Sequence, residues 1–130
     1  MKPPKIVTAI FVNPEELFQK FPPRHTKLFG THSSIAYDPV SLDDVEVGKH
    51  CTLKIMGRVS DEKCDVLIVE NKKSKLKYPH ITLSCSPTGH PIESNELLER
   101  AMKGNSVEYL KEPISIEGVE GYWDGDIKHI

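Results

Sequence analysis

Residues 51–70 constrain the fold of this chain more than any other stretch. Apolar and polar positions alternate through its first half, as Cys51, Leu53, Ile55, Gly57 and Val59 against Thr52, Lys54 and Arg58. A period of two places the apolar side chains on one face of a strand. The polar residues 60–63 and the apolar run 66–69 follow, so this stretch predicts a β-hairpin with a buried face.

Further strands are expected on both sides of the hairpin. Residues 5–12, 27–37 and 80–85 are rich in β-branched and aromatic residues or alternate in polarity, with Gly30 as a bulge in the second segment. One or two closing strands are expected near the end of the chain, over residues 114–116 and 119–123. Strands therefore dominate the predicted structure.

Two helices are expected among these strands. Asn13 caps the first helix, Pro14 occupies its first position, and two prolines end it after residue 21. Ser94 caps the second helix, which Gly104 ends. The order strand, helix, strand, hairpin, strand, helix, strand predicts an α+β fold with an antiparallel sheet.

Length and composition restrict the class of protein. A chain of 130 residues without a linker fits one domain over residues 1–130, expected to be a monomer. The net charge of −2 excludes a strongly basic nucleic-acid wrapper, so any contact with a polyanion is local. The 3 cysteines include no Cys-x-x-Cys pair, which predicts reduced thiols and a cytoplasmic location. No apolar run approaches the roughly 20 residues of a membrane helix.

Three tripeptides share the pattern His-x-Ser/Thr, with their histidines at His32, His50 and His80. In a strand, residues i and i+2 point to the same face, so each tripeptide would present an imidazole beside a hydroxyl. Among 6 histidines one such match is expected by chance, and a single match carries little information. Three matches make a functional pair more credible than coincidence.

Two facing strands of this kind would bring together the groups that phosphodiester hydrolysis needs. One imidazole takes a proton from the attacking water, and the other gives a proton to the leaving oxygen. Histidine titrates near neutral pH, so both protonation states are accessible. The hydroxyls can donate to the phosphate oxygens, where charge builds in the transition state. This chemistry requires no metal and no cofactor.

The sequence Pro79-His80-Ile81-Thr82-Leu83-Ser84 resembles the second motif of the 2H phosphoesterase superfamily. That superfamily includes the LigT-like RNA cyclic phosphodiesterases and the phosphodiesterase domains of some tRNA ligases. The region around His32, which follows a strand and a helix, is similar to the first motif, although Ser33 and Ser34 replace the usual hydrophobic residue and threonine.

The resemblance implies two pseudo-symmetric lobes of antiparallel sheet with flanking helices around a central cleft. It also implies hydrolysis of a 2′,3′-cyclic phosphate or a related RNA or nucleotide phosphodiester. His32 and His80 would be the acid–base pair, in either order, and Ser34 and Thr82 the phosphate ligands. The expected partner is an RNA end or a nucleotide that carries such a group.

Several alternatives stay open. His50-Cys51-Thr52 fits the bare motif better than the His32 region does, but it lies only 30 residues before His80. The run 72–77, with Lys75 and Lys77, is either a solvated loop or a contact for a phosphate backbone. Tyr37 could stack a base or pack on the rim of the site.

The main alternative function is a non-catalytic RNA- or nucleotide-binding module on the same scaffold. A structural protein without an anion site is a third possibility, and it would hold the two imidazoles far apart. No His or Cys pair has the spacing of a zinc site, so no metal is expected.

Overall fold

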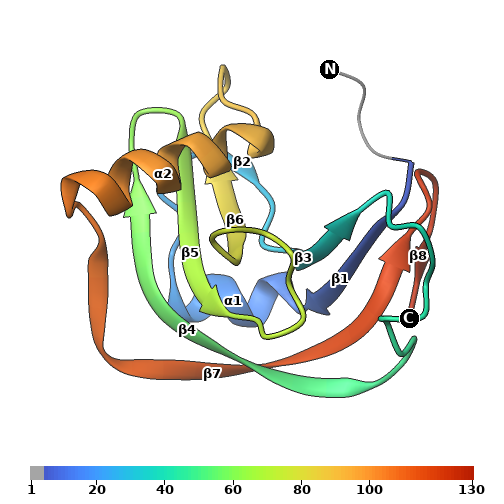
Figure 1. Ribbon diagram of the computed structural model, residues 1–130. Helices are drawn as coiled ribbons and strands as arrows, with labels where there is room; N and C mark the ends of the chain where they lie inside the picture. Colours follow the sequence, from blue (N-terminus) through green and yellow to red (C-terminus); the bar gives the residue numbers. More distant parts are fainter. Residues whose placement is uncertain (1–4) are drawn as a thin grey trace.

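A computed structural model describes residues 5–130 of the chain. The elements follow one another as β1 (Val7–Val12), α1 (Pro14–Lys20), β2 (Lys27–Leu28), β3 (His32–Tyr37), β4 (His50–Ser60), β5 (Cys64–Glu70), β6 (His80–Cys85), the 3-10 turn η1 (Pro91–Glu93), α2 (Ser94–Gly104), β7 (Glu108–Trp123) and β8 (Lys128–His129) (Figure 1). This is an α+β fold, as predicted. Neither described helix has the length and apolar character needed to cross a membrane.

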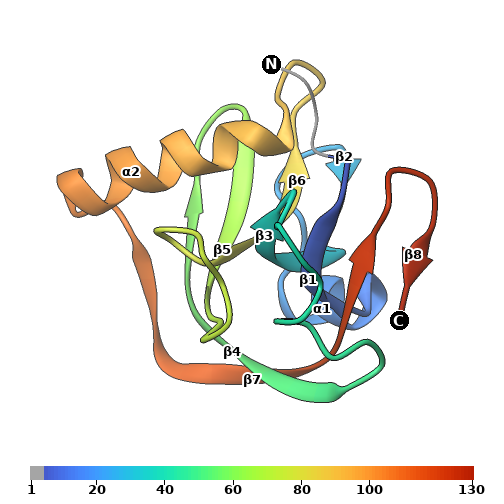
Figure 2. The same cartoon turned by 45° about the vertical axis from the view of Figure 1, so that its right-hand side comes forward.

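The strands form one antiparallel sheet that closes on itself. Its order is β1-β3-β6-β5-β4-β7-β8, and β7 pairs with β1 as well as with β4. Closure through β7 gives the sheet a barrel-like shape, which both ribbon views show as a long curve of β4 and β7 beneath the other strands (Figures 1 and 2). The double pairing of β7 therefore joins the two ends of the sheet.

The main hydrophobic core fills one side of this sheet. It contains alternate residues of six strands together with α1, including Ile35, Ile81 and Leu83. Helix α1 begins where expected, because Asn13 Oδ1 accepts a hydrogen bond of 3.0 Å from the backbone N–H of Glu15. The side chains that alternate with these core residues on β3 and β6 must point to the opposite side of the sheet.

A second hydrophobic cluster lies on that opposite side, beneath α2. Leu97, Leu98 and Ala101 of α2 pack there on residues of β4, β5 and β6, among them Val66 and Ile68. Figures 1 and 2 show α2 at one side of the molecule, over β4 and β5, and β8 at the other, with β3 and β6 between them. Helix α2 thus covers only part of this side of the sheet.

The predicted hairpin is confirmed as β4 and β5, and the strand over residues 80–85 as β6. The prediction of one continuous strand over residues 27–37 is wrong, because residues 29–31 separate β2 from β3. Gly30 adopts a positive φ of 66°, and its N–H donates to the carbonyl of Thr82. That conformation is easy for glycine and turns the chain between the two strands.

Two other expectations about element ends are corrected. The closing segments form one 16-residue strand, β7, that passes through Pro113. Its register against β4 shifts between Ile55 and Gly57, and such an irregularity accommodates a proline. Ser94 is not the cap of α2 but its first residue, and Glu93 precedes it without a side-chain cap bond.

Candidate functional site

Strands β3 and β6 bring two of the three His-x-Ser/Thr tripeptides side by side. They pair antiparallel, with the residue after His32 opposite the residue after His80. In this register His32 faces Thr82, and Ser34 faces His80, on the same side of the sheet. The four side chains occupy the corners of one rectangle, with the imidazoles on a diagonal of about 7–8 Å between neighbouring strands.

His80 is held in one orientation by its own strand. Its Nδ1 donates a hydrogen bond of 2.7 Å to the carbonyl oxygen of Tyr78, so Nε2 points away with a free lone pair in the neutral ring. Burial lowers the pKa of His80, and the bond to Tyr78 acts in the opposite direction because a carbonyl stabilises the imidazolium. The side chain is only 6% exposed.

The surroundings of His32 disfavour a positive charge on its imidazole more strongly than those of His80 do. Burial first, and then the charge of His80, lower the pKa of His32 to about 4. Its Nδ1 lies 2.7 Å from the hydroxyl of Thr31, which can donate to that nitrogen or accept from it. The charge of His80 therefore acts on His32, and the pKa values of both imidazoles lie below the ordinary histidine value.

The two hydroxyls differ in their surroundings. Thr82 Oγ1 lies 2.8 Å from the hydroxyl of Ser94, the first residue of α2, which is completely buried. Among the described residues, no protein group hydrogen-bonds the side chain of Ser34, whereas its backbone carbonyl accepts from Ser74. Ser34 can therefore direct its O–H toward a bound anion, and Ser94 fixes the rotamer of Thr82.

Apolar side chains border the four polar ones on both sides. On one side, Ile68 and Val66 of β5 lie opposite His80 and Thr82, under α2. On the other, Phe11 of β1 lies opposite His32, with ring centroids 5.7 Å apart. These walls exclude water from the imidazoles and account for the desolvation that lowers their pKa values.

The structure does not bring His50 into this group. His50 is exposed at the start of β4, where it pairs with Val119, and Val119 pairs with Phe11. Three strand spacings, about 14 Å, therefore separate it from His32. Tyr37 is also apart: it lies at the other end of β3, five residues from His32.

The lysines before β6 are engaged with acidic residues. Lys77 Nζ lies 3.2 Å from Glu99 of α2 and 5.3 Å from the ring centroid of Tyr78. The backbone N–H of Lys75 donates to the carbonyl of Ile35, and its Nζ lies 3.9 Å from a carboxylate oxygen of Asp44. Both side chains remain largely exposed, so an anion could exchange with either carboxylate.

No group of three or more His, Cys, Asp or Glu side chains within residues 5–130 is arranged to hold a metal ion.

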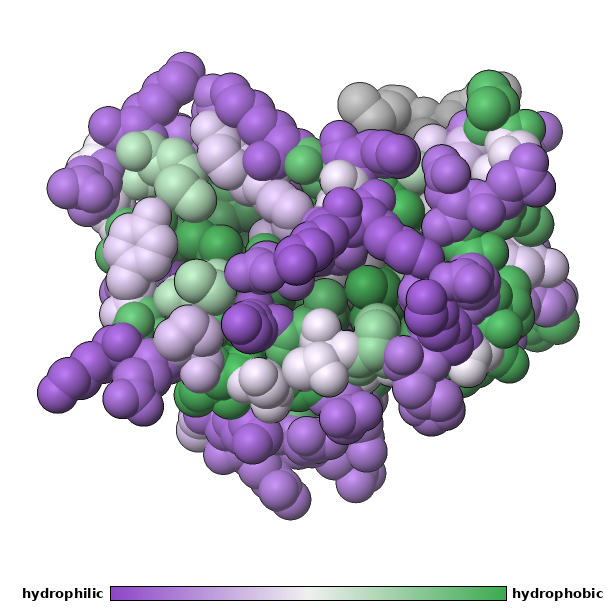
Figure 3. Space-filling view, turned by 60° about the horizontal axis from the view of Figure 1, so that its bottom comes forward, coloured by the Kyte–Doolittle hydropathy of each residue, from purple (hydrophilic) through white to green (hydrophobic). Residues whose placement is uncertain are grey.

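All three cysteines are free thiols, as predicted, and Cys64 and Cys85 face each other with their sulfurs 3.8 Å apart. The face seen in Figure 3 mixes hydrophobic and hydrophilic side chains, and the hydrophilic ones cross its centre as well as its rim.

Fold and site together define a small α+β protein with a closed antiparallel sheet and a paired histidine–hydroxyl face. Its fold is similar to that of a fungal RNA kinase in a crystal structure, with a TM-score of 0.65 over 94% of this chain at 12% sequence identity. The chain spans 45% of the length of that kinase. The sequence matches no family model and no curated protein.

Two residues around the site, Phe11 and Thr31, were not recognised from the sequence, and Ser94 was expected to cap α2, not to contact Thr82. Thr31 immediately precedes His32, so the first motif could have drawn attention to it. Ser94 and Phe11 carry no such signal, because they meet the site through the pairing of distant segments.

Proposed function

We propose that this protein is a metal-independent phosphoesterase that hydrolyses a 2′,3′-cyclic phosphate, or a related RNA or nucleotide phosphodiester, by acid–base catalysis. One observation supports this above all others: His32 and His80 lie on the diagonal of one face of two paired strands, with Ser34 and Thr82 at the other corners. Likeness to a fold found in an RNA kinase favours an RNA end as the substrate.

In this proposal the phosphate lies between two pseudo-symmetric lobes, one built on β5, β6 and α2 and the other on β1 and β3. Displacement at phosphorus is in line, so the attacking and leaving oxygens lie on opposite sides of it. Imidazoles on a diagonal can serve these two oxygens, while hydroxyls on the other diagonal donate to the non-bridging oxygens.

The contacts of the two histidines favour one division of roles. The carbonyl of Tyr78 stabilises the imidazolium of His80, whereas His32 has no such acceptor fixed by the backbone. A single proton shared by the pair therefore resides on His80, which makes His80 the general acid and His32 the general base.

Bonds and protons are conserved over each turnover. The water oxygen bonds to phosphorus as His32 Nε2 takes the water proton, and the phosphorus–oxygen bond to the leaving group breaks. His80 gives its proton to the leaving oxygen, and a phosphomonoester forms. His32 afterwards loses its proton to solvent, and His80 regains one.

A bound anion supplies the charge that the free site lacks. Both imidazoles have lowered pKa values in the free protein, so burial disfavours their protonated forms there. A phosphodiester between them adds a negative charge within a few ångströms, which favours the imidazolium form. Substrate binding thus creates the general acid.

The experiment is hydrolysis of nucleoside 2′,3′-cyclic monophosphates in the presence of EDTA, with products separated by chromatography. We expect turnover by the wild type and a loss of about 100-fold or more in kcat for His32→Gln and for His80→Gln. His90→Gln, which removes an exposed histidine outside this site, is the matched control and should retain full activity. Turnover that survives both substitutions would contradict the proposal, and tight binding without turnover would favour a non-catalytic nucleotide-binding module.

The division of roles has its own test. A nucleoside 3′-(p-nitrophenyl) phosphate has a leaving group that departs without a proton, so it does not need a general acid. His80→Gln should therefore lose much less activity on this ester than on the cyclic phosphate, whereas His32→Gln should lose equally on both. The reverse pattern would exchange the two roles.

A further inference from the structure

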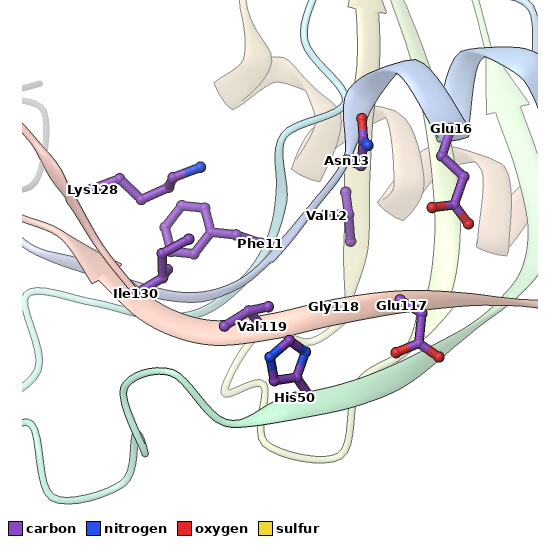
Figure 4. Close-up of a pocket in the computed structure, with 10 residues that line it drawn as sticks. All are labelled: Phe11, Val12, Asn13, Glu16, His50, Glu117, Gly118, Val119, Lys128 and Ile130. Atoms are coloured by element: carbon purple, nitrogen blue, oxygen red, sulfur yellow. The ribbon is translucent and has the colours of Figure 1, made fainter.

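A cavity of about 290 Å³ opens beside the histidine pair, on the β1 side. Its lining comes from β1, α1, β4, β7 and the end of the chain (Figure 4). Phe11, Lys128 and Ile130 lie at one end, and the carboxylates of Glu16 and Glu117 lie at the other (Figure 4). The cavity therefore combines an aromatic wall with an edge rich in hydrogen-bond acceptors.

The strand residues Phe11, His50 and Val119 of the cavity lie on the same face of the sheet as the histidines, whereas Asn13 and Glu16 come from the start of α1. Paired residues of adjacent strands share a face, and the pairing runs without interruption from His50 to Val119, from Val119 to Phe11, and from Phe11 to His32. Phe11 thus belongs both to the wall of the cavity and to the wall of the proposed catalytic site. One strand spacing, about 4.8 Å, separates its strand from that of His32.

We propose that this cavity is the subsite for the base of the substrate nucleotide, and that it prefers guanine. This inference rests on the proposed phosphoesterase function. A cyclic phosphate held between His32 and His80 would direct its ribose toward Phe11 and its base into the cavity beyond. Phe11 is only 8% exposed and contributes an apolar wall to the cavity, and the polar edge provides selectivity.

The polar groups of the cavity complement one base better than the others. The Watson–Crick edge of guanine presents two adjacent N–H donors and one carbonyl acceptor, and a carboxylate accepts two parallel hydrogen bonds. Glu16 and Glu117 supply the carboxylates. Asn13 supplies a donor, because its Oδ1 is occupied by the N–H of Glu15 and its amide N–H₂ remains free for a base carbonyl.

The other bases leave these acceptors unsatisfied. Adenine and cytosine each place one donor beside a ring acceptor, and uracil places one donor between two acceptors. A carboxylate facing a base acceptor is repelled and desolvated without compensation, which costs more than a missing attraction. Lys128 Nζ lies 5.4 Å from the centroid of the Phe11 ring and partly offsets the two acids without donating to the same edge.

The test compares kcat/KM for the 2′,3′-cyclic phosphates of guanosine, adenosine, cytidine and uridine. We expect about tenfold or greater preference for the guanosine substrate in the wild type. Glu16→Gln and Glu117→Gln should each reduce that preference toward equality, mainly through a lower kcat/KM for the guanosine substrate. Glu15→Gln, an exposed neighbour on the same helix, and Glu112→Gln, an exposed residue of the same strand, are the matched controls.

A binding measurement separates this inference from the proposed function. Guanosine 2′-monophosphate should shift the backbone amide resonances of Gly118 and Val119, and uridine 2′-monophosphate should shift them much less. Equal hydrolysis of all four substrates would overturn the subsite and leave the phosphoesterase standing. Selective binding of the guanosine nucleotide without hydrolysis of any substrate would support the subsite and overturn the phosphoesterase, and absence of both would overturn the two together.

Discussion

The hydroxyl of Ser94 lies 2.8 Å from that of Thr82, and this bond joins the first residue of α2 to the strand that carries His80. If Ser94 donates, the hydrogen of Thr82 is free to donate to a phosphate oxygen. If Ser94 is removed, the Thr82 hydroxyl can rotate away. Ser94 is therefore a positioning residue for a proposed phosphate ligand.

Ser94→Ala should lower kcat about tenfold without a comparable change in KM, because the oriented donor acts mainly where charge builds in the transition state. Combined with Thr82→Val, which has no hydroxyl to orient, the substitution should have little further effect. Steady-state kinetics of the two single variants and the double variant check this. A loss that adds fully in the double variant would assign Ser94 a separate role.

Burial of His32 makes the protein sensitive to acid above pH 4. An unfolded histidine has a pKa of about 6.5, and the folded pKa of His32 is about 4, so the unfolded state binds more protons between these values. The free energy of unfolding should therefore decrease as the pH falls from 6.5 to 4, by up to about 3 kcal/mol from this residue.

His32→Gln should flatten that part of the profile, as measured by urea denaturation at pH 7 and pH 5. The exposed residue His50 provides the control, because His50→Gln removes a histidine that contributes no such burial. An unchanged slope in His32→Gln would show that other groups govern stability in this range.

Asp65 anchors the opposite end of the β5–β6 pair. Its fully buried carboxylate accepts two hydrogen bonds from Arg58, at 2.9 and 2.8 Å, and one each from Ser84 and the backbone N–H of Arg24. Burial acts to raise the pKa of Asp65, but these donors outweigh it, and the pKa lies below its usual range.

Asp65→Asn should lower the free energy of unfolding at pH 7 by about 3–5 kcal/mol, because Arg58 is left as a buried, poorly paired charge. Because the folded pKa is depressed, the stabilisation is complete above an unfolded pKa of about 3.9 and is lost as the pH falls below it. Glu108→Gln, which breaks only the exposed pair with Arg24, should cost less than about 1 kcal/mol in the same urea titrations.

Anion binding at the histidine pair should take up a proton. Diethyl phosphate keeps one charge throughout the neutral range, so any proton uptake comes from the protein. Isothermal titration calorimetry at pH 7 in buffers of different ionisation enthalpy should give an uptake of up to about one proton per ligand, as expected for an imidazole whose pKa rises on binding. In His80→Gln the uptake should disappear, and binding without uptake in the wild type would contradict the protonation scheme.

Local signals in the sequence predicted most of the elements. The alternation over residues 51–70 predicted the β4–β5 hairpin, and the pair Asn13-Pro14 predicted the start of α1. These predictions succeeded because capping and alternation depend on neighbours in the chain. Glycine 30 was recognised as irregular, but its positive φ, which divides β2 from β3, depends on a bond to Thr82 more than fifty residues away.

Non-local contacts account for the errors and the omissions. Ser94 has the side chain of a typical cap, yet its hydroxyl is engaged by Thr82 of another element. The closing segments predicted over residues 114–116 and 119–123 are parts of one strand, β7, which also includes Pro113 because the register against β4 shifts at that point. The pairing of β3 with β6, which sets His32 opposite Thr82, was expected from a family resemblance and not from the residues themselves.

The double pairing of β7 has a consequence for how the chain acquires its structure. Residue 11 finds its partner at residue 119, so the ring of strands cannot close until the two distant parts of the chain meet. Contacts of such wide sequence separation carry a large loop-closure cost and slow folding. We therefore expect the pairing of β1 with β7 to limit the folding rate. Phe11 already pairs with His32 of β3, but its neighbour on β7 arrives only then, so the wall beside His32 is expected to be completed late, after the β4–β5 hairpin has formed.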